Sequence, residues 1–117
     1  DATRRLVLHG ADGVVFVADS QKEKQAENLE SFRNLQANLL DQGVDPRGVP
    51  LCLQYNKRDQ PEAVSFAEME AALNFRGAPA LEASAVTGAG VFETLKEITK
   101  LVLTRIGKDL GEASAPR

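Results

Sequence analysis

The amino-acid sequence predicts an α/β fold with three layers, in which helices cover both faces of a parallel β-sheet. Short apolar runs rich in valine and leucine alternate with longer segments of helical periodicity, in the order β-α-β-α-β-α. The apolar runs are continuous rather than alternating, which is typical of strands buried on both faces. Such alternation favours parallel pairing with right-handed crossovers, so ligands are expected at the carboxyl ends of the strands.

The first half of the chain is expected to hold a helix end, two strands and a long helix. Residues 3–9 read as the last turns of a helix that Gly10 stops. Residues 13–18 form a continuous apolar run and predict the first buried strand. Residues 21–42 carry apolar side chains at helical spacing, with a charged opposite face. Residues 51–55 predict a second buried strand.

The second half is expected to add a short helix, a strand and a final helix. Ser65 and Glu68 match a capping box, which predicts a helix from Ser65 to about Asn74. Residues 80–83 predict the third strand. Residues 91–106 carry the apolar face of the final helix at a spacing of three and four residues.

The chain is expected to be one portion of a single domain, followed by a tail. All predicted strands and helices fall within residues 1–106, whereas residues 107–117 are small and polar without a period, which is typical of a flexible tail. Because the chain has no initiating methionine and opens in what reads as the middle of an element, we expect it to be part of a longer protein.

The composition excludes several classes of function. The 117 residues carry a net charge of −3, so no basic surface for nucleic acid is expected. Cys52 is the only cysteine and His9 the only histidine, which excludes an intrachain disulfide and metal cages built on these residues. No apolar run approaches the roughly 20 residues that span a bilayer. No signal peptide begins the chain, so we expect a cytoplasmic protein.

Residues of the tetrapeptide Asn56-Lys57-Arg58-Asp59 have the chemistry to read guanine. They follow the second strand directly, at the edge where ligands are expected. Guanine presents two adjacent donors, N1–H and the exocyclic amine, and the carboxylate of Asp59 can accept both; adenine lacks this pair. Asn56 can reach N7 and tie neighbouring loops together. The aliphatic stem of Lys57 can lie across the base plane, and Arg58 is expected to point away into solvent.

A Ser-Ala pair follows the third strand, in the next loop along the same edge. The hydroxyl of Ser84 can steady the carboxylate of Asp59, and the backbone N–H of Ala85 can reach the O6 acceptor of guanine. The small side chain of Ala85 lets the backbone approach the base. A Ser-Ala pair alone is weak evidence for a nucleotide site. Its position one strand after the tetrapeptide makes that interpretation stronger.

Together the two motifs resemble the last two nucleotide motifs of Ras-like small GTPases. The segments GADGVVFVADS, LQYNKRD and GVFETLKEITKLVLT look, more narrowly, like bacterial gliding-motility GTPases of the MglA type. The resemblance covers residues 1–106. It implies that the chain is the C-terminal part of a P-loop NTPase fold, a Ras-like G domain. It also implies binding of GTP or GDP with Mg²⁺, slow hydrolysis, a switch role in cell polarity and gliding motility, and a roadblock-type activator of the MglB kind as partner.

Two departures from the small-GTPase pattern stand out. Val86 occupies the position where a lysine often follows Ser-Ala, and we include Val86 among the residues expected to hold the base. The 117 residues also contain no G-x-x-x-x-G-K-[ST] motif and no identifiable switch region, so they offer no phosphate loop and no Mg²⁺ ligand. In the family these parts lie N-terminal to the segment that resembles this chain.

Two other functions remain open at this point. The chain could be a non-catalytic, GTPase-like module that binds protein partners, which the missing phosphate loop favours. It could also be an adenine-nucleotide enzyme, which Asp59 disfavours because adenine has no matching donors.

The first strand raises a question of stability. In the family it lies beside the strand that feeds the phosphate loop, so without that neighbour residues 14–17 would present an open apolar edge. We therefore expect the isolated 117 residues to aggregate or to pair this edge with something else.

Overall fold

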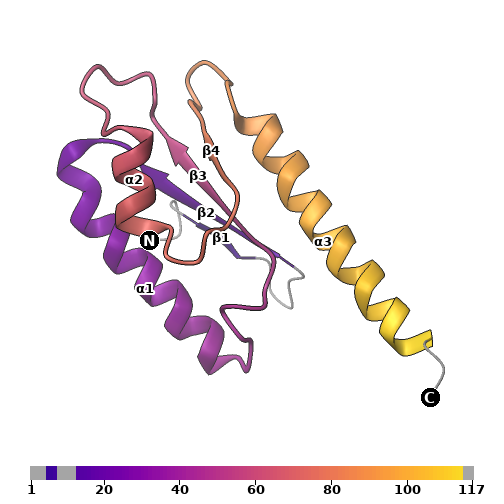
Figure 1. Cartoon of the computed structure of the whole chain (residues 1–117). Coiled ribbons are helices and arrows are strands. Elements are labelled where there is room, and N and C mark those ends of the chain that lie inside the picture. The colour runs from indigo at the N-terminus through magenta and orange to yellow at the C-terminus, as the bar shows by residue number, and fades with distance from the viewer. Residues whose placement is uncertain (1–4, 8–12, 115–117) are drawn as a thin grey trace.

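Three parallel strands and one short antiparallel strand form a single sheet, in the order β1-β2-β3-β4 (Figure 1). The computed structural model describes residues 5–7 and 13–114. Its strands are β1 Arg5–Val7, β2 Val14–Asp19, β3 Leu51–Asn56 and β4 Ala80–Glu82. Strands β2, β3 and β4 pair in parallel, whereas β1 pairs with β2 in the antiparallel direction.

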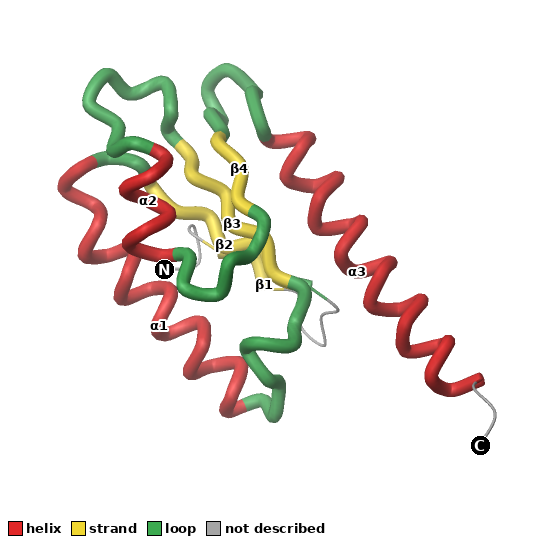
Figure 2. Tube along the Cα trace, in the orientation of Figure 1, coloured by secondary structure: helices red, strands yellow, loops and turns green. Residues whose placement is uncertain are grey.

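Helices cover the sheet on both sides, which confirms the predicted three-layer α/β class (Figure 2). The α1 and α2 helices lie on one face and the long α3 helix on the other (Figure 1). The helical elements are the 3₁₀ turn η1 Lys22–Lys24, α1 Gln25–Asp41, α2 Phe66–Leu73 and α3 Val91–Ser114.

The two faces of β3 differ in chemistry. Successive strand residues point to opposite faces, and Leu51, Leu53 and Tyr55 belong to the apolar core beneath α1 and α2. Cys52 and Gln54 point to the α3 side. Cys52 is fully buried there, and burial, with a contribution from Glu97, raises the pKa of its thiol to about 11, so it behaves as a small apolar residue.

Tyr55 links β3 to α2 at the end of the strand. Its ring is fully buried and meets the ring of Phe66 edge-on at a centroid distance of 5.5 Å. Its hydroxyl donates to Oε1 of Glu70 at 2.6 Å. Burial and this hydrogen bond both raise the pKa of Tyr55, so the phenol stays protonated across the physiological range.

Ser65 is the N-cap of α2, as the sequence predicts, and Glu68 contacts its hydroxyl with both backbone and side chain. The hydroxyl of Ser65 accepts from the backbone N–H of Glu68 at 3.2 Å and lies 3.2 Å from that residue's carboxylate. The helix that follows ends at Leu73, with Asn74 as its C-cap, as the sequence predicts.

The predicted helix at residues 3–9 is wrong for the residues that the structure describes, because residues 5–7 form β1. The register pairs Leu6 with Val15, along the edge of β2 that was expected either to cause aggregation or to pair with something else. Unpaired backbone groups on that edge favour strand pairing over local helical preference. Residues 3, 4 and 8–10, including His9, lie outside the described parts of the chain.

Residues 107–114, predicted to belong to a flexible tail, are helical instead. The α3 helix passes Ile106 and continues to Ser114, and the last three residues lie outside the described chain. Gly107 and Gly111 lie inside this helix, and an isolated glycine costs a helix only about 1 kcal/mol relative to alanine. No proline interrupts the segment before residue 116, so nothing there forces the helix to end.

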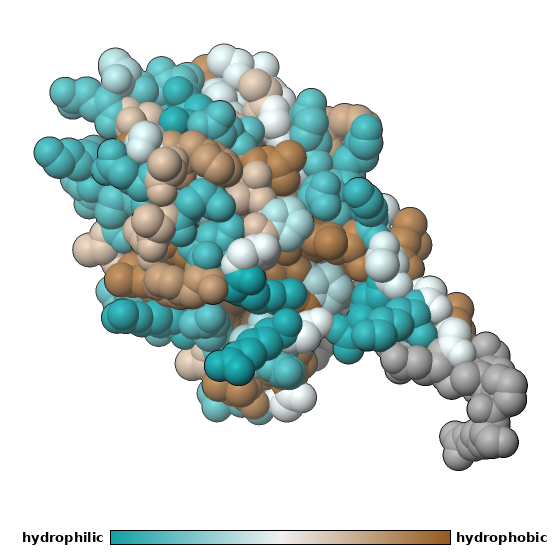
Figure 3. Space-filling view, in the orientation of Figure 1, coloured by the Kyte–Doolittle hydropathy of each residue, from teal (hydrophilic) through white to brown (hydrophobic). Residues whose placement is uncertain are grey.

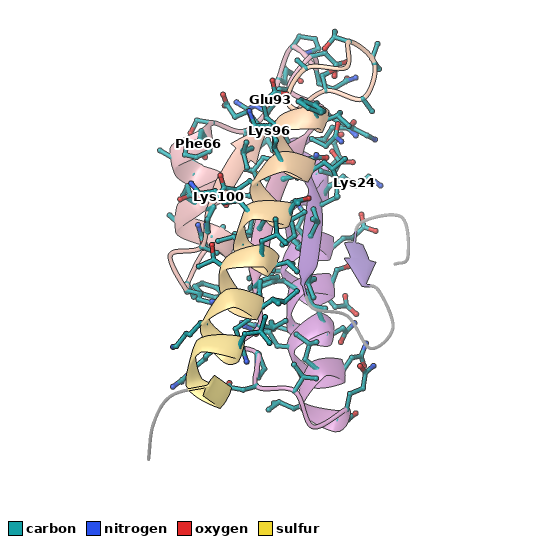
Figure 4. All side chains as sticks on the ribbon, turned by 90° about the vertical axis from the view of Figure 1, so that its right-hand side faces the viewer. Lys24, Phe66, Glu93, Lys96 and Lys100 are labelled. Carbon is teal, nitrogen blue, oxygen red and sulfur yellow. The ribbon has the colours of Figure 1, made fainter. Side chains whose placement is uncertain are left out.

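Apolar side chains remain exposed along α3. Figure 3 shows them reaching the surface there, and Phe92, Leu95, Leu103 and Leu110 are each at least 60% exposed. Figure 4, in which α3 crosses in front of the sheet, labels charged side chains on the same helix, at Glu93, Lys96 and Lys100. None of the helices in the described part of the chain is long and apolar enough to cross a membrane.

We predict that Gly90→Ala destabilises the chain more than Gly88→Ala. Both glycines have a positive φ, +76° and +83°, so alanine costs roughly 1–2 kcal/mol of backbone strain at either position. A Cβ at Gly90 would also lie 1.9 Å from the carbonyl oxygen of Glu82, whereas a Cβ at Gly88 meets nothing within 4 Å. Urea unfolding monitored by circular dichroism would measure the difference, and equal losses for the two variants would contradict this account.

Candidate functional site

The carboxyl ends of three parallel strands meet at one edge of the sheet. The register of β2 and β3 sets Asp19 opposite Asn56, so both strands end at the same level. Backbone bonds then join the loops that follow β3 and β4: Arg58 N–H donates to the carbonyl of Ala83 at 3.1 Å. Ligands of parallel α/β sheets bind at such an edge.

A cavity of about 420 Å³ opens at this edge. Its volume is within the range of small-molecule sites. Residues from β2, η1, the loop after β3 and the loop after β4 line it: Val17, Ala18, Asp19, Lys24, Asn56, Lys57, Asp59, Gln60, Ala85 and Val86. Lys24, labelled in Figure 4, contributes from the 3₁₀ turn.

The carboxylate of Asp59 is exposed at the cavity and is held by Ser84. The buried hydroxyl of Ser84 donates to Oδ1 of Asp59 at 2.7 Å and accepts from Thr87 N–H at 3.2 Å. The hydrogen bond from Ser84 lowers the pKa of Asp59, with smaller help from Gln60 and from the charge of Lys57. The carboxylate is therefore ionised and oriented near neutral pH.

The carboxamide of Asn56 joins three parts of the site. Its Oδ1 accepts from the backbone N–H of Lys57 at 2.7 Å and from that of Ala85 at 3.1 Å. Its Nδ2 donates to Oε1 of Gln54 at 2.9 Å. Asn56 thus holds the loop after β4 against the loop after β3. The N–H of Ala85, expected from the sequence to face a ligand, is bonded to Asn56.

Lys57 is held in an unusual backbone conformation and in an ion pair. Its φ of +66° makes it the only non-glycine residue with positive φ among those described. Its Nζ lies 3.1 Å from Oδ2 of Asp19, whose side chain is only 9% exposed. The ion pair therefore fixes the ammonium end of the Lys57 side chain and holds its aliphatic stem beside the cavity.

Asp19 is held through both its side chain and its backbone and is not a helix cap, since Gln21 is the N-cap of η1 and Lys24 that of α1. Its Oδ1 accepts from Gln21 N–H at 2.9 Å, and Asn28 and Gln25 bind its backbone. Burial acts to raise the pKa of Asp19, but the hydrogen bonds from Gln21 and Lys57 outweigh it and lower the pKa overall. The anion is thereby available to hold Lys57.

Arg58 points away from the cavity but is not simply solvated, as the sequence reading had it. Its guanidinium pairs with Glu82 at 3.2 Å and donates to the carbonyl of Val64. The side chain is 22% exposed. Arg58 therefore fastens the back of the loop that carries Asp59.

The structure brings the sequence-predicted residues together. Five of them line the cavity directly, and Ser84 acts from behind through Asp59. Val86 is at the rim and is 83% exposed. Sequence reasoning missed Asp19 as the partner of Lys57 and Gln54 as the partner of Asn56. For the contact between Gln54 and Asn56, the available sequence signal was a polar glutamine within an otherwise apolar strand.

A parallel sheet with helices on both faces, and with an Asn-Lys-x-Asp loop and a Ser-Ala loop at its ligand edge, defines the class of Ras-like GTPase domains. The sequence profile of the ADP-ribosylation factor family matches residues 5–102, and the chain belongs to that family.

Individual relatives agree with this placement. The chain is 56% identical to the mutual gliding-motility protein MglA of Myxococcus xanthus, over 92% of this chain and 55% of that protein. It is 35% identical to human ADP-ribosylation factor-like protein 4D, over 86% of this chain and 51% of that protein. It is 30% identical to ADP-ribosylation factor-like protein 6 of Caenorhabditis briggsae, over 84% and 53%. The chain spans about half the length of the curated relatives it matches.

We predict that Ser84→Ala raises the pKa of Asp59 toward its ordinary value. The pKa of Asp59 is lower in the folded state than in the unfolded state. The ionised carboxylate therefore stabilises the fold above the unfolded-state pKa, and this stabilisation is lost as the pH falls through the folded-state pKa. The variant should therefore lose less stability on acidification. Carboxyl ¹³C shifts followed by NMR titration would measure the pKa. Gln60→Ala, which removes a weaker contact at 3.4 Å, should raise it less; an equal or larger effect at Gln60 would contradict the role of Ser84.

Proposed function

We propose that this chain is the guanine-recognition part of a small GTPase that acts as a GTP/GDP switch in bacterial cell polarity and gliding motility. The observation that carries the proposal is the oriented, ionised carboxylate of Asp59 at a cavity that Asn56 and Lys57 also line. A carboxylate facing such a cavity matches the adjacent N1–H and amine donors of guanine.

Each residue has a defined part in holding the base. Asp59 accepts from the two guanine donors, and Asn56 donates its remaining Nδ2 proton to N7. The stem of Lys57, anchored by Asp19, covers one face of the ring. Ala85 offers its backbone N–H to O6 by sharing it with Oδ1 of Asn56, and Val86 covers the rim.

The Mg²⁺ of a bound nucleotide does not fit the residues described here. Within residues 5–7 and 13–114, no three His, Cys, Asp or Glu side chains gather closely enough to hold a metal ion. Asp19, the carboxylate beside the cavity other than Asp59, is committed to Lys57. We therefore assign guanine recognition to these residues, and derive no step of GTP hydrolysis from them.

The proposed cellular role is based on a relative of the chain. A relative that is 56% identical is named for gliding motility, which supports a motility switch; its action in the cytoplasm is part of the same proposal. A regulator of the roadblock type, similar to MglB, is the proposed activator.

A second candidate is a GTPase-like module that binds protein partners without turning over nucleotide. The exposed apolar side chains along α3 favour it. Nucleotide turnover by the protein encoded by the complete gene separates the two candidates, because the module would show none.

We predict that Asp59→Asn weakens GTP binding by roughly 10- to 100-fold, since a hydrogen bond to a charged group is worth about 1.5–3 kcal/mol. Preference should shift toward xanthosine triphosphate, because the C2 carbonyl of xanthine accepts from the new amide. Competition against a fluorescent GDP analogue, in the protein encoded by the complete gene, would measure both. Asp41→Asn, at an exposed position in the last turn of α1, is the charge-matched control. Unchanged GTP affinity in the Asp59 variant would overturn the assignment.

A further inference from the structure

Two polar side chains are buried between the sheet and α3, where apolar packing would be expected. Gln54 in β3 is 6% exposed and Thr94 in α3 is 3% exposed. Gln54 Nε2 donates to Thr94 Oγ1 at 2.8 Å, across 40 positions of sequence. Buried polar groups destabilise a core unless they are hydrogen-bonded, and this hydrogen bond provides each of the two side chains with a partner.

The pair belongs to a chain of hydrogen bonds that can run in one direction only. Thr94 Oγ1 donates to the carbonyl oxygen of Gly90 at 2.7 Å. A carbonyl cannot donate, so the single hydroxyl proton of Thr94 is used there, and the hydroxyl can only accept from Gln54. Gln54 must therefore turn its NH₂ group toward Thr94 and its Oε1 toward Asn56. That oxygen accepts from Asn56 Nδ2 at 2.9 Å.

The anchor of this chain is fixed by the backbone. Gly90 has a φ of +76°, and it packs so closely on Glu82 that a Cβ would lie 1.9 Å from that residue's carbonyl oxygen. Gly90 is therefore held against the β4 end of the sheet, and its carbonyl also accepts from Thr94 N–H at 3.0 Å. Because this carbonyl can only accept, it sets the direction of the hydrogen bonds that run from Thr94 in α3 through Gln54 in β3 to Asn56 at the cavity.

We propose that Gln54 and Thr94 are positioning residues that act, together with the two backbone N–H groups at Oδ1, to determine which end of the Asn56 carboxamide faces which partner. The other side of Asn56 requires the same orientation, because Oδ1 accepts from two backbone N–H groups. In a flipped amide, an NH₂ group would face those two donors, and Oδ1 would face Oε1 of Gln54. The set orientation leaves the second Nδ2 proton of Asn56 for an acceptor atom of the ligand.

This inference deepens the proposed function and rests on it, since the acceptor is then N7 of the guanine base. It predicts that one part of base recognition, the hydrogen bond to N7, depends on two side chains that do not contact the base. Gln54 and Thr94 should affect the reading of N7, whereas Asp59 reads the opposite edge of guanine independently.

The test uses the protein encoded by the complete gene and compares GDP with 7-deaza-GDP, which lacks the N7 acceptor. One neutral hydrogen bond corresponds to about a two- to tenfold difference in Kd, and we expect the wild type to show it. In Gln54→Leu and Thr94→Val the ratio should fall toward one, as in Asn56→Ala. Discrimination between GDP and ADP should persist in Gln54→Leu and Thr94→Val.

Gln54→Glu is the matched rescue variant. A glutamate at this position still presents an acceptor to Asn56 Nδ2, so the ratio of GDP to 7-deaza-GDP affinity should stay near the wild-type value, even though a buried acid lowers stability. Thermal unfolding of all variants would report that stability loss separately. A purely structural role for Gln54 and Thr94 predicts lower melting temperatures with an unchanged ratio in Gln54→Leu and Thr94→Val, and that result would overturn the inference.

A second measurement separates this inference from the proposed function. In the nucleotide-free protein, the Nδ2 protons of Asn56 should exchange more slowly with solvent in the wild type than in Gln54→Leu, as measured by NMR. Equal exchange would overturn the inference whatever ligand binds. Slower exchange in a wild type that binds no guanine nucleotide would overturn the proposed function and leave the positioning role standing.

Discussion

The parallel register of β2 and β3 is the constraint on which the rest of the site depends. Because Val14 pairs with Leu51 and the ladder runs without interruption, both strands end together at Asp19 and Asn56. The ladder extends one step further, as Ser20 N–H donates to the carbonyl of Asn56 at 3.0 Å. Backbone pairing therefore places Asp19, the ion-pair partner of Lys57, at the same level as Asn56. A shift of one residue would move Asp19 to the opposite face of the sheet.

The two faces of β3 contact two helical layers, and the side chains on these faces differ in chemistry. Toward α1 and α2 the strand offers Leu51, Leu53 and Tyr55 to an apolar core, and burial of such side chains drives folding. Toward α3 it offers Gln54, then Asn56, so polarity on this face increases toward the cavity. The polar side chains on this face thus belong to the same hydrogen-bonded network as the candidate site, while stability comes mainly from the other face.

Local sequence signals predicted much of this structure, and non-local ones were missed. Continuous apolar runs predicted β2 and β3, a capping box predicted α2, and the tetrapeptide beginning at Asn56 predicted the cavity-lining loop. The strand at residues 5–7 was missed because its conformation depends on the open edge of β2 and not on its own preferences. The partnership of Gln54 with Thr94 was missed because it joins a strand to a helix 40 residues away, a distance over which a single sequence carries no pattern.

Tyr55 makes the chain a convenient object for spectroscopy. The sequence contains one tyrosine and no tryptophan, so its ultraviolet emission comes from a single buried ring adjacent to Asn56. The phenol is hydrogen-bonded to the carboxylate of Glu70, and a nearby proton acceptor quenches tyrosine fluorescence by taking up the excited-state proton. The emission intensity therefore reports on the contact between β3 and α2 at the base of the loop, without any label being introduced.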